Sequence, residues 1–296
     1  MIKFKGKKIM VPFDFSANAE KALSHAALIA SLQKGDLYLV NVIGKSELVD
    51  IILPILKLKT NKVVVDLVSK KLEEVALKVR KNYGIVPKTI VSTGSVTTEI
   101  ANLAEENKVD MIVMGTQGKD SKSDLFLGST AYRLITKAPA PVMTIKGAIN
   151  KKGYKNILLP VDLTQHSRQK VNYAIDMAKV FGAKITVLGL YDENEKEDKF
   201  KLEIIGKQII ALCQKNKVST EVFIDKTKHR VSKTISFAKK HKNDLIITMT
   251  DQKIEAAKGI LSSYNHELVH NAEIPVISLE PESNNELEGG TAGLPF

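Results

Sequence analysis

The sequence predicts an α/β fold: two tandem doubly wound domains, each built on a five-stranded parallel sheet. The first observation behind this prediction is an alternation of strands and helices along the chain. Continuous apolar runs such as Asp36–Val42 and Lys184–Leu188 are followed by helical stretches rich in Ala, Lys and Leu. Strands that are apolar on both faces are typical of a parallel sheet that helices cover on both sides.

The second observation is an internal repeat. Three kinds of segment occur in each half in the same order: an apolar strand ending in a Pro-x-Asp-x-Ser/Thr turn, a strand after an aspartate, and a short strand around a proline. The pairs are Val11–Ser16 with Leu159–Thr164, Val109–Val113 with Asn243–Ile247, and Ala140–Ile145 with Ile274–Leu279. A repeat of roughly 140 residues has the size of a whole domain and is too long for a solenoid unit.

The repeat predicts a first domain at residues 1–150, a second at residues 151–280 and a tail at residues 281–296. A length of 296 residues with 44% hydrophobic residues is enough for two domains with proper cores. The tail is rich in Glu, Asn and Gly and poor in apolar residues, so we expect it to be disordered.

A spaced glycine pattern is the most informative motif of the chain. It reads Gly115-x2-Gly118-x9-Gly128-Ser129 and directly follows the apolar run Met111–Met114. Glycines at the carboxyl end of a strand let the backbone approach a ligand, and a following helix start offers unpaired N–H groups to phosphate. The pattern is neither the phosphate loop G-x-x-x-x-G-K-[ST] nor the dinucleotide turn G-x-G-x-x-G. Because doubly wound folds bind ligands at this edge of the sheet, the pattern predicts a nucleotide site.

Together, the tandem halves, the Pro-x-Asp-x-Ser turn, the strand end Asn41-Val42-Ile43 and the glycine spacing resemble the universal stress protein family in its tandem two-domain form. The glycine spacing is that of the ATP-binding branch of the family, and the resemblance covers about residues 1–146 and 154–280. It implies an adenine-nucleotide α-hydrolase-like fold. It also implies an ATP-binding stress-response or regulatory protein, UspA-like, that holds ATP, with or without Mg²⁺, in its first domain with little or no turnover.

The resemblance further implies which residues hold the nucleotide. The turn after the first strand would line adenosine, the end of the second strand would pack on the base, and the glycine motif would hold the ribose and phosphates. These residues are Pro12, Phe13, Asp14, Val42, Met114, Gly115, Gly118, Gly128, Ser129 and Thr130. The physical interpretation agrees, because we expect Ser129 and Thr130 to open a helix at Ala131–Lys137 with hydroxyl donors at its positive end.

The second half departs from this pattern at every phosphate position. The register is set by Asp110 with Asp244 and by Pro141 with Pro275, and it places Met249, Gln252, Ser262 and Ser263 where the first half has Gly115, Gly118, Gly128 and Ser129. Side chains with a Cβ atom cannot offer the same backbone approach. Asp162 keeps the adenosine-side carboxylate. We therefore expect the second half to bind ATP weakly or not at all.

The formal net charge of +11 raises the possibility of a polyanion partner. The lysines, however, are spread along helices among Glu and Asp, aromatic residues make up 5%, and no recognised nucleic-acid motif occurs. The sequence therefore predicts a solvated surface without a nucleic-acid partner. A single cysteine, Cys213, excludes a disulfide framework, and neither a signal peptide nor a run of transmembrane length is present. We expect a cytoplasmic protein with no membrane partner.

One further motif, His266-Glu267-Leu268-Val269-His270, matches the zinc signature H-E-x-x-H. On a helix it places two imidazoles on one face, but a catalytic zinc also needs a third ligand and an open cleft, and no nearby His-containing motif supplies them. We predict no metal site and no protease here, while an adventitious or structural surface metal stays an alternative.

Other features of the chain leave alternatives open. The apolar segment Leu48–Leu58 is either a lid or groove, or a helical turn packed on the protein itself, and the latter is favoured. No Ser-His-Asp or Cys-His grouping has recognisable spacing, so no catalytic residue is predicted. A slow Mg²⁺-dependent ATPase and a ligand-free interaction module remain alternative functions. The last strands, Pro141–Ile145 and Pro275–Leu279, predict pairing of the halves as an internal pseudo-dimer, and a homodimer is a further alternative.

Overall fold

The computed structural model describes residues 2–44, 61–116, 128–146, 153–164, 166–192, 196–250 and 264–282. The chain divides into two compact units. The first unit is Lys5–Lys151, and the second unit consists of Lys152–Phe296 together with the N-terminal residues Met1–Phe4. The apolar segment Leu48–Leu58 lies outside the described residues, as does most of the predicted tail. Within the part of the chain that is described, no helix is long and apolar enough to cross a membrane.

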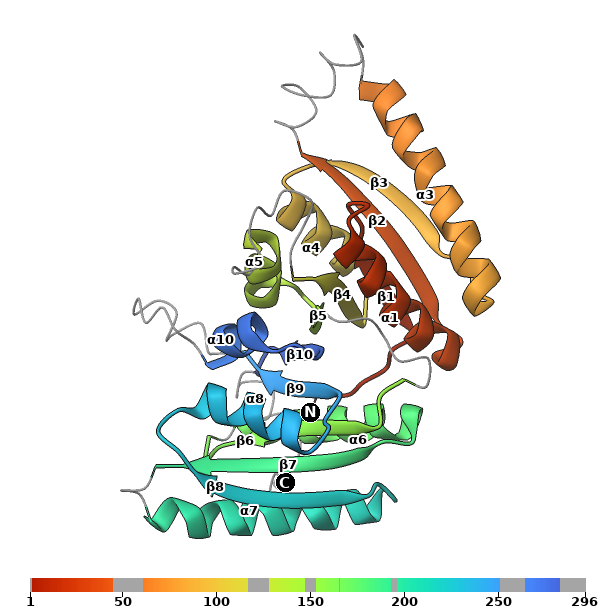
Figure 1. The fold of residues 1–296 in the computed structure, drawn as a ribbon. Coiled ribbons are helices and arrows are strands. Elements are labelled where there is room, and N and C mark those ends of the chain that lie inside the picture. The colour runs from red at the N-terminus through yellow and green to blue at the C-terminus, as the bar shows by residue number, and fades with distance from the viewer. Residues whose placement is uncertain are drawn as a thin grey trace, which may run out of the picture. The chain divides into compact units, whose positions relative to one another are not determined.

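The first unit alternates strands and helices (Figure 1). Its elements are β1 (Lys8–Pro12), α1 (Ala17–Gln33), β2 (Asp36–Gly44), α3 (Asn61–Tyr83), β3 (Lys88–Gly94), α4 (Val96–Glu106), β4 (Met111–Gly115), α5 (Ser129–Lys137) and β5 (Val142–Ile145). All strand pairs are parallel, in the order β3-β2-β1-β4-β5. The order reverses between β1 and β4, which is where a doubly wound fold opens its ligand crevice.

The second unit repeats this topology. Its elements are β6 (Asn156–Val161), the 3-10 helix η2 (His166–Arg168), α6 (Lys170–Phe181), β7 (Lys184–Tyr191), α7 (Lys196–Lys215), β8 (Thr220–Lys226), α8 (Arg230–Lys240), β9 (Leu245–Met249), α10 (Tyr264–Asn271) and β10 (Val276–Leu279). The parallel order is β10-β9-β6-β7-β8. The predicted fold class, two tandem five-stranded doubly wound sheets, is confirmed.

The core of each unit explains why these segments become strands and helices. In β1, Ile9, Met10 and Val11 are fully buried, as expected for a central strand covered on both faces. Helix α1 buries a stripe of alanines at helical spacing, Ala19, Ala22, Ala26, Ala27 and Ala30, so its backbone lies close to the sheet. Its N-terminus is capped by Ser16, whose side chain accepts a hydrogen bond from the N–H of Ala19.

An aspartate before the fourth strand closes each unit in the same way. One carboxylate oxygen of Asp110 accepts the N–H groups of Lys7 and Lys8, both at 3.0 Å. Asp244 accepts the corresponding N–H groups of Lys155 and Asn156 at 2.7 and 2.9 Å. Each carboxylate therefore fixes the start of the first strand of its unit beside the start of the fourth. Asp110 and Asp244 occupy equivalent positions in the two units, as the sequence alignment of the two halves predicted.

The N-terminus of the chain packs on the second unit. The ring of Phe4 makes an edge contact with Tyr173 of α6 at a centroid distance of 5.2 Å, and both side chains are buried. The chain then enters the first unit at Lys5. The second unit consequently draws part of its core from residues that precede the first unit in the sequence.

Candidate nucleotide-binding site

The turn after β1 is held rigidly by backbone and side-chain hydrogen bonds. The N–H of Phe13 donates to the carbonyl of Val40 at 2.7 Å, and the Asn41 side-chain amide donates to the carbonyl of Phe13 at 2.8 Å. The Asp14 carboxylate accepts the N–H of Ser16 at 3.0 Å. These bonds explain two features of the sequence pattern, since Asn41 ties the end of β2 to the turn and Asp14 closes it ahead of α1.

Phe15 adopts a strained backbone conformation in this turn. Its φ angle is 63°, in the left-handed region that favours glycine. The residue is 36% exposed, and its ring contacts the ring of the buried Phe13 edge-on at 5.2 Å. Among the described residues, the other non-glycine residues with positive φ are lysines beyond helix ends: Lys34, Lys108, Lys217 and Lys242. Strain in a turn that the surroundings hold this firmly is characteristic of functional sites.

The end of β4 packs directly on the first turn of α1. A Cβ atom on Gly115 would lie 2.9 Å from the Cβ of Asn18 and 3.1 Å from its carbonyl carbon. Glycine is therefore required here by close packing of helix on strand, independently of any phosphate. The sequence argument assigned this glycine to ligand approach alone, and the structure adds this second reason.

Helix α5 begins at Ser129, two residues earlier than predicted, with Gly128 as its N-cap residue. The N–H of Gly128 donates to the carbonyl of Thr116 at 2.8 Å, which holds the helix start at the end of β4. Gly128 has no side chain to cap this N-terminus, and no other residue of the described part of the chain is seen to cap it, in contrast to α1 with its Ser16 cap. Within the described residues, the first N–H groups of α5 are therefore available to an anionic ligand, whereas α1 uses a side chain to cap its own start.

The predicted site residues that the structure describes lie at or just after the carboxyl ends of three neighbouring strands, β1, β2 and β4, and at the start of α5. They are Pro12, Phe13, Asp14, Val42, Met114, Gly115, Gly128, Ser129 and Thr130, whereas Gly118 lies outside the described residues. Phe13 and Met114 are buried and Ser129 is exposed. Residues more than a hundred positions apart in sequence meet here because parallel strands share one carboxyl edge.

The second unit shapes the corresponding edge differently. Met249 ends β9 at the position of Gly115, and the helix that faces it starts late: α6 begins eight residues after Asp162, whereas α1 begins three residues after Asp14. The short helix η2 occupies the interval and contacts β9. Gln252, Ser262 and Ser263 lie outside the described residues.

Lys170 is buried beside this edge, a feature that sequence reasoning missed. Its ammonium group donates to Ser167 Oγ at 3.0 Å, and that oxygen also accepts the N–H of Asp162 at 3.0 Å. Burial lowers the pKa of Lys170 to about 8, while the nearby charge of Asp162 opposes the shift. In register, Lys170 replaces the buried Ala22 of α1, which is the signal that could have identified it.

Tyr264 opens α10 at the position that Thr130 holds in α5. Its hydroxyl lies 2.8 Å from Thr234 Oγ1 of α8. Burial raises the pKa of Tyr264 well above its ordinary range, and the negative charge of Asp162 raises it further. The side chain therefore lies between α8 and the end of β6, on the side where the first unit has its candidate site.

The H-E-x-x-H motif does form a helix, since it lies within α10. Leu268 and Val269 are buried against the unit, while His266, Glu267 and His270 are half-buried. Among the residues that the structure describes, no three His, Cys, Asp or Glu side chains gather as a metal site would require. Cys213 is buried in α7, where burial raises the pKa of its thiol.

The fold and the site edge define a doubly wound α/β protein with a candidate ligand crevice. Comparison with known proteins defines the family: the model of the universal stress protein family matches residues 6–146 and again residues 153–279. The chain belongs to this family, with two family domains in tandem.

Individual relatives agree with this assignment. Universal stress protein MJ0577 of Methanocaldococcus jannaschii is 32% identical over 155 residues, covering 47% of this chain and 94% of that protein. MJ0531 of the same organism is 32% identical over 146 residues, covering 47% of this chain and 82% of that protein. The crystal structure of a universal stress protein from Archaeoglobus fulgidus has a TM-score of 0.75 at 19% identity, covering 94% of this chain and 99% of that one, and so shows the shared fold.

Proposed function

We propose that this protein is an ATP-binding regulatory protein of the stress response, which holds one adenine nucleotide at the carboxyl edge of the first unit. The observation that carries the proposal is the uncapped N-terminus of α5, anchored by the Gly128 to Thr116 hydrogen bond beside the end of β4. Such a helix start is a ready site for phosphate. The family membership and the glycine spacing support the same conclusion.

The turn after β1 supports adenosine binding at the same edge. Its hydrogen bonds hold Asp14 in place without help from a ligand, and preorganised groups lose little entropy on binding. The Asp14 carboxylate closes a turn, which suits a binding role better than activation of water. We therefore propose that ATP is a sensed ligand with little or no turnover.

The second unit, in this proposal, does not hold a phosphate chain. Met249 brings a side chain where the first unit has Gly115, and Tyr264 occupies the helix start that corresponds to Thr130. The hydrogen bond between the Tyr264 hydroxyl and Thr234 Oγ1 engages this helix start within the unit itself. We propose that this unit has kept the fold for assembly and lost the nucleotide.

Assembly is the second part of the proposal. β5 and β10 each end the strand order of their own unit, and each is short and apolar. An edge of this kind favours pairing with another strand. We propose that the two units associate through these strands, and separately expressed units should then form dimers or bind each other. If the separately expressed units were stable monomers that neither dimerise nor bind each other, the proposed association through β5 and β10 would be contradicted.

Calorimetric titration with ATP, followed by assay of released phosphate from the same sample with and without Mg²⁺, tests the functional part. The proposal expects saturable binding with turnover no faster than minutes per event at about 25 °C, far below the roughly 10 per second of a typical enzyme. Turnover in the ordinary enzymatic range would favour the ATPase alternative. No saturable binding would favour the ligand-free interaction module.

A further inference from the structure

The segment around α8 has an unusual charge composition. Residues 226–243 contain seven Lys or Arg residues and no Asp or Glu. The matching segment of the first unit, residues 92–109 around α4, contains three Glu and one Lys. The two units thus share a fold but carry opposite charge on this helix. The even mixing of lysines with acids, which argued against a polyanion partner, does not hold for this segment.

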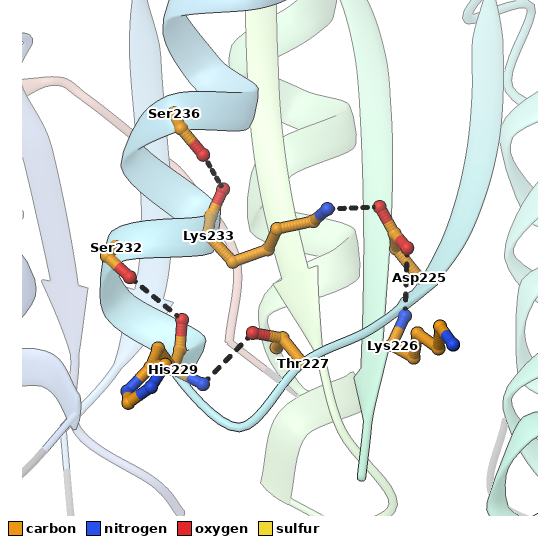
Figure 2. Close-up of polar contacts among 7 residues, drawn as sticks. All are labelled: Asp225, Lys226, Thr227, His229, Ser232, Lys233 and Ser236. Atoms are coloured by element: carbon orange, nitrogen blue, oxygen red, sulfur yellow. Dashed lines mark hydrogen bonds and ion pairs between the residues drawn. The ribbon is translucent and has the colours of Figure 1, made fainter. Parts of the chain in front are cut away.

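The acids that flank the segment are both engaged in local contacts. Asp225 pairs with Lys233 at 2.6 Å, and Figure 2 shows Lys233 reaching from α8 to this carboxylate near the end of β8. The hydrogen bond from Lys233 lowers the pKa of Asp225. Asp244 accepts the backbone N–H groups of Lys155 and Asn156. Asp225 therefore neutralises Lys233, while the exposed Lys228, Lys239 and Lys240 contribute positive charge to the surface of this segment.

The exposed side of α8 gathers hydrogen-bond donors. Thr234, Phe237 and Ala238 are buried on the inner side of the helix. The exposed residues on the opposite side, called the α8 basic face, are Lys228, His229, Ser232, Ser236, Lys239 and Lys240. In Figure 2 the hydroxyls of Ser232 and Ser236 turn back to the carbonyls of His229 and Lys233. Both serine oxygens can still accept or exchange a bond at the surface.

We propose that the α8 basic face binds the phosphate backbone of duplex DNA without reading its sequence. Lysine ammonium groups and serine hydroxyls are the side chains that contact DNA phosphates. The ring of Phe237 is buried, where it stacks on His241 at 3.9 Å and contacts Phe223 at 5.2 Å, so that His229 is the single ring among the residues of the face. The face therefore lacks the stacking platform that single strands require, and a duplex presents phosphates without needing one.

The dimensions of the face suit this partner. Ser232 and Lys240 are separated by about 12 Å along α8 at roughly 1.5 Å per residue, and Lys228 lies just before the helix start. Duplex DNA carries one negative charge per roughly 1.7 Å of axis, so several phosphates lie within that span. If the three lysines of the face each neutralise one phosphate, the slope of log K against log salt is about −2.7, and affinity falls about 40-fold between 50 and 200 mM salt.

Fluorescence anisotropy of a labelled 20-base-pair duplex tests the proposal with the full chain. The variant Lys228→Glu, Lys239→Glu, Lys240→Glu should bind at least tenfold more weakly than the unaltered protein at 50 mM salt. The control is Lys71→Glu, Lys78→Glu, Lys81→Glu on the exposed side of α3, which makes the same change in net charge in the first unit. The control should bind within about twofold of the unaltered protein, because it leaves every residue of the α8 basic face unchanged.

Circular dichroism confirms that both variants are folded before the comparison. Equal losses in the two variants would show a response to net charge alone and would overturn the proposal. Absence of duplex binding at 50 mM salt, or a salt slope near zero, would overturn it as well. Tighter binding of a single-stranded RNA or of a polyglutamate peptide than of the duplex would assign the face to a different partner and contradict the inference.

Discussion

Gly115 and Asn18 lie so close together that a single added carbon on the glycine would sit 2.9 Å from the asparagine Cβ. This contact joins the end of β4 to the first turn of α1, and so joins the two strands, β1 and β4, between which the crevice opens. Asn18 backbone atoms lie at 3.1 and 3.2 Å from the same position, so no rotamer change can relieve the crowding. The shape of the candidate site thus depends on one glycine.

The substitution Gly115→Ala should lower the free energy of unfolding of the first unit by about 1–3 kcal/mol, the range for overpacking a core. Urea denaturation followed by tyrosine fluorescence or circular dichroism measures this. An unchanged midpoint would mean that α1 can shift away without cost, and the packing argument would fail. The second unit should be unaffected, because Gly115 and its contact Asn18 both belong to the first unit.

The left-handed Phe15 predicts an inverted order of stability for two substitutions. Phe15→Gly should be about 1 kcal/mol more stable than Phe15→Ala, because both lose the ring and glycine alone accepts φ of 63° without strain. Leu163 is the matched control, equally exposed at 36% and not among the residues with positive φ. There the alanine variant should be the more stable of the two. The same order at both positions would contradict the strain assignment.

Buried Lys170 predicts that stability rises with pH. Its folded pKa of about 8 lies below the ordinary 10.5, so between these values the unfolded chain holds a proton that the native state has lost. Stability therefore increases across this window, by up to about 3 kcal/mol, and is independent of this group below pH 8. Above pH 10, ionisation of tyrosines in the unfolded chain acts in the opposite direction, because the pKa values of Tyr154 and Tyr264 are raised in the native state.

Urea denaturation of the second unit at pH 7, 8, 9 and 9.5, with Lys170→Met as the comparison, measures this dependence. The methionine variant keeps the length of the side chain and removes the ammonium group. It should be more stable at pH 7 and show little rise with pH. Parallel curves for the two proteins would indicate that Lys170 is solvated in the native state.

The N-terminal Phe4 predicts a destabilisation that appears in the second unit. Phe4→Ala should lower the free energy of unfolding by about 3–5 kcal/mol, because it removes a buried ring that packs on Tyr173. Amide hydrogen exchange should show faster exchange in α6 and β6, with α1 and β1 unchanged. Faster exchange confined to the first unit would contradict the assignment of Phe4 to the core of the second unit.

Much of the fold was predictable because parallel strands buried on both faces leave a clear apolar pattern in the sequence. The internal repeat strengthened these predictions, since several strands occur at matching positions in both halves. The register from Asp110 and Asp244 was reliable because both carboxylates make the same structural contacts. The start of α5 was misplaced by two residues, since glycine before a serine gives no distinct helix signal. Lys170 could not be anticipated in detail, because an isolated lysine on a helix usually lies at the surface. The replacement of the start of α1 by η2 and a later α6 was not predicted, because η2 contacts β9 and no local sequence pattern encodes a contact between segments so far apart in the chain.

The stoichiometry and location of ATP binding test the central claim most directly. Asp14→Asn keeps the oxygen that accepts the Ser16 N–H and removes the charge, and Asp162→Asn is its counterpart in the second unit. Calorimetry of the full chain should give one ATP per chain, an affinity loss of at least tenfold, about 1.4 kcal/mol, for Asp14→Asn, and little change for Asp162→Asn. Two equivalent sites, or equal losses from the two substitutions, would contradict the assignment of the nucleotide to the first unit.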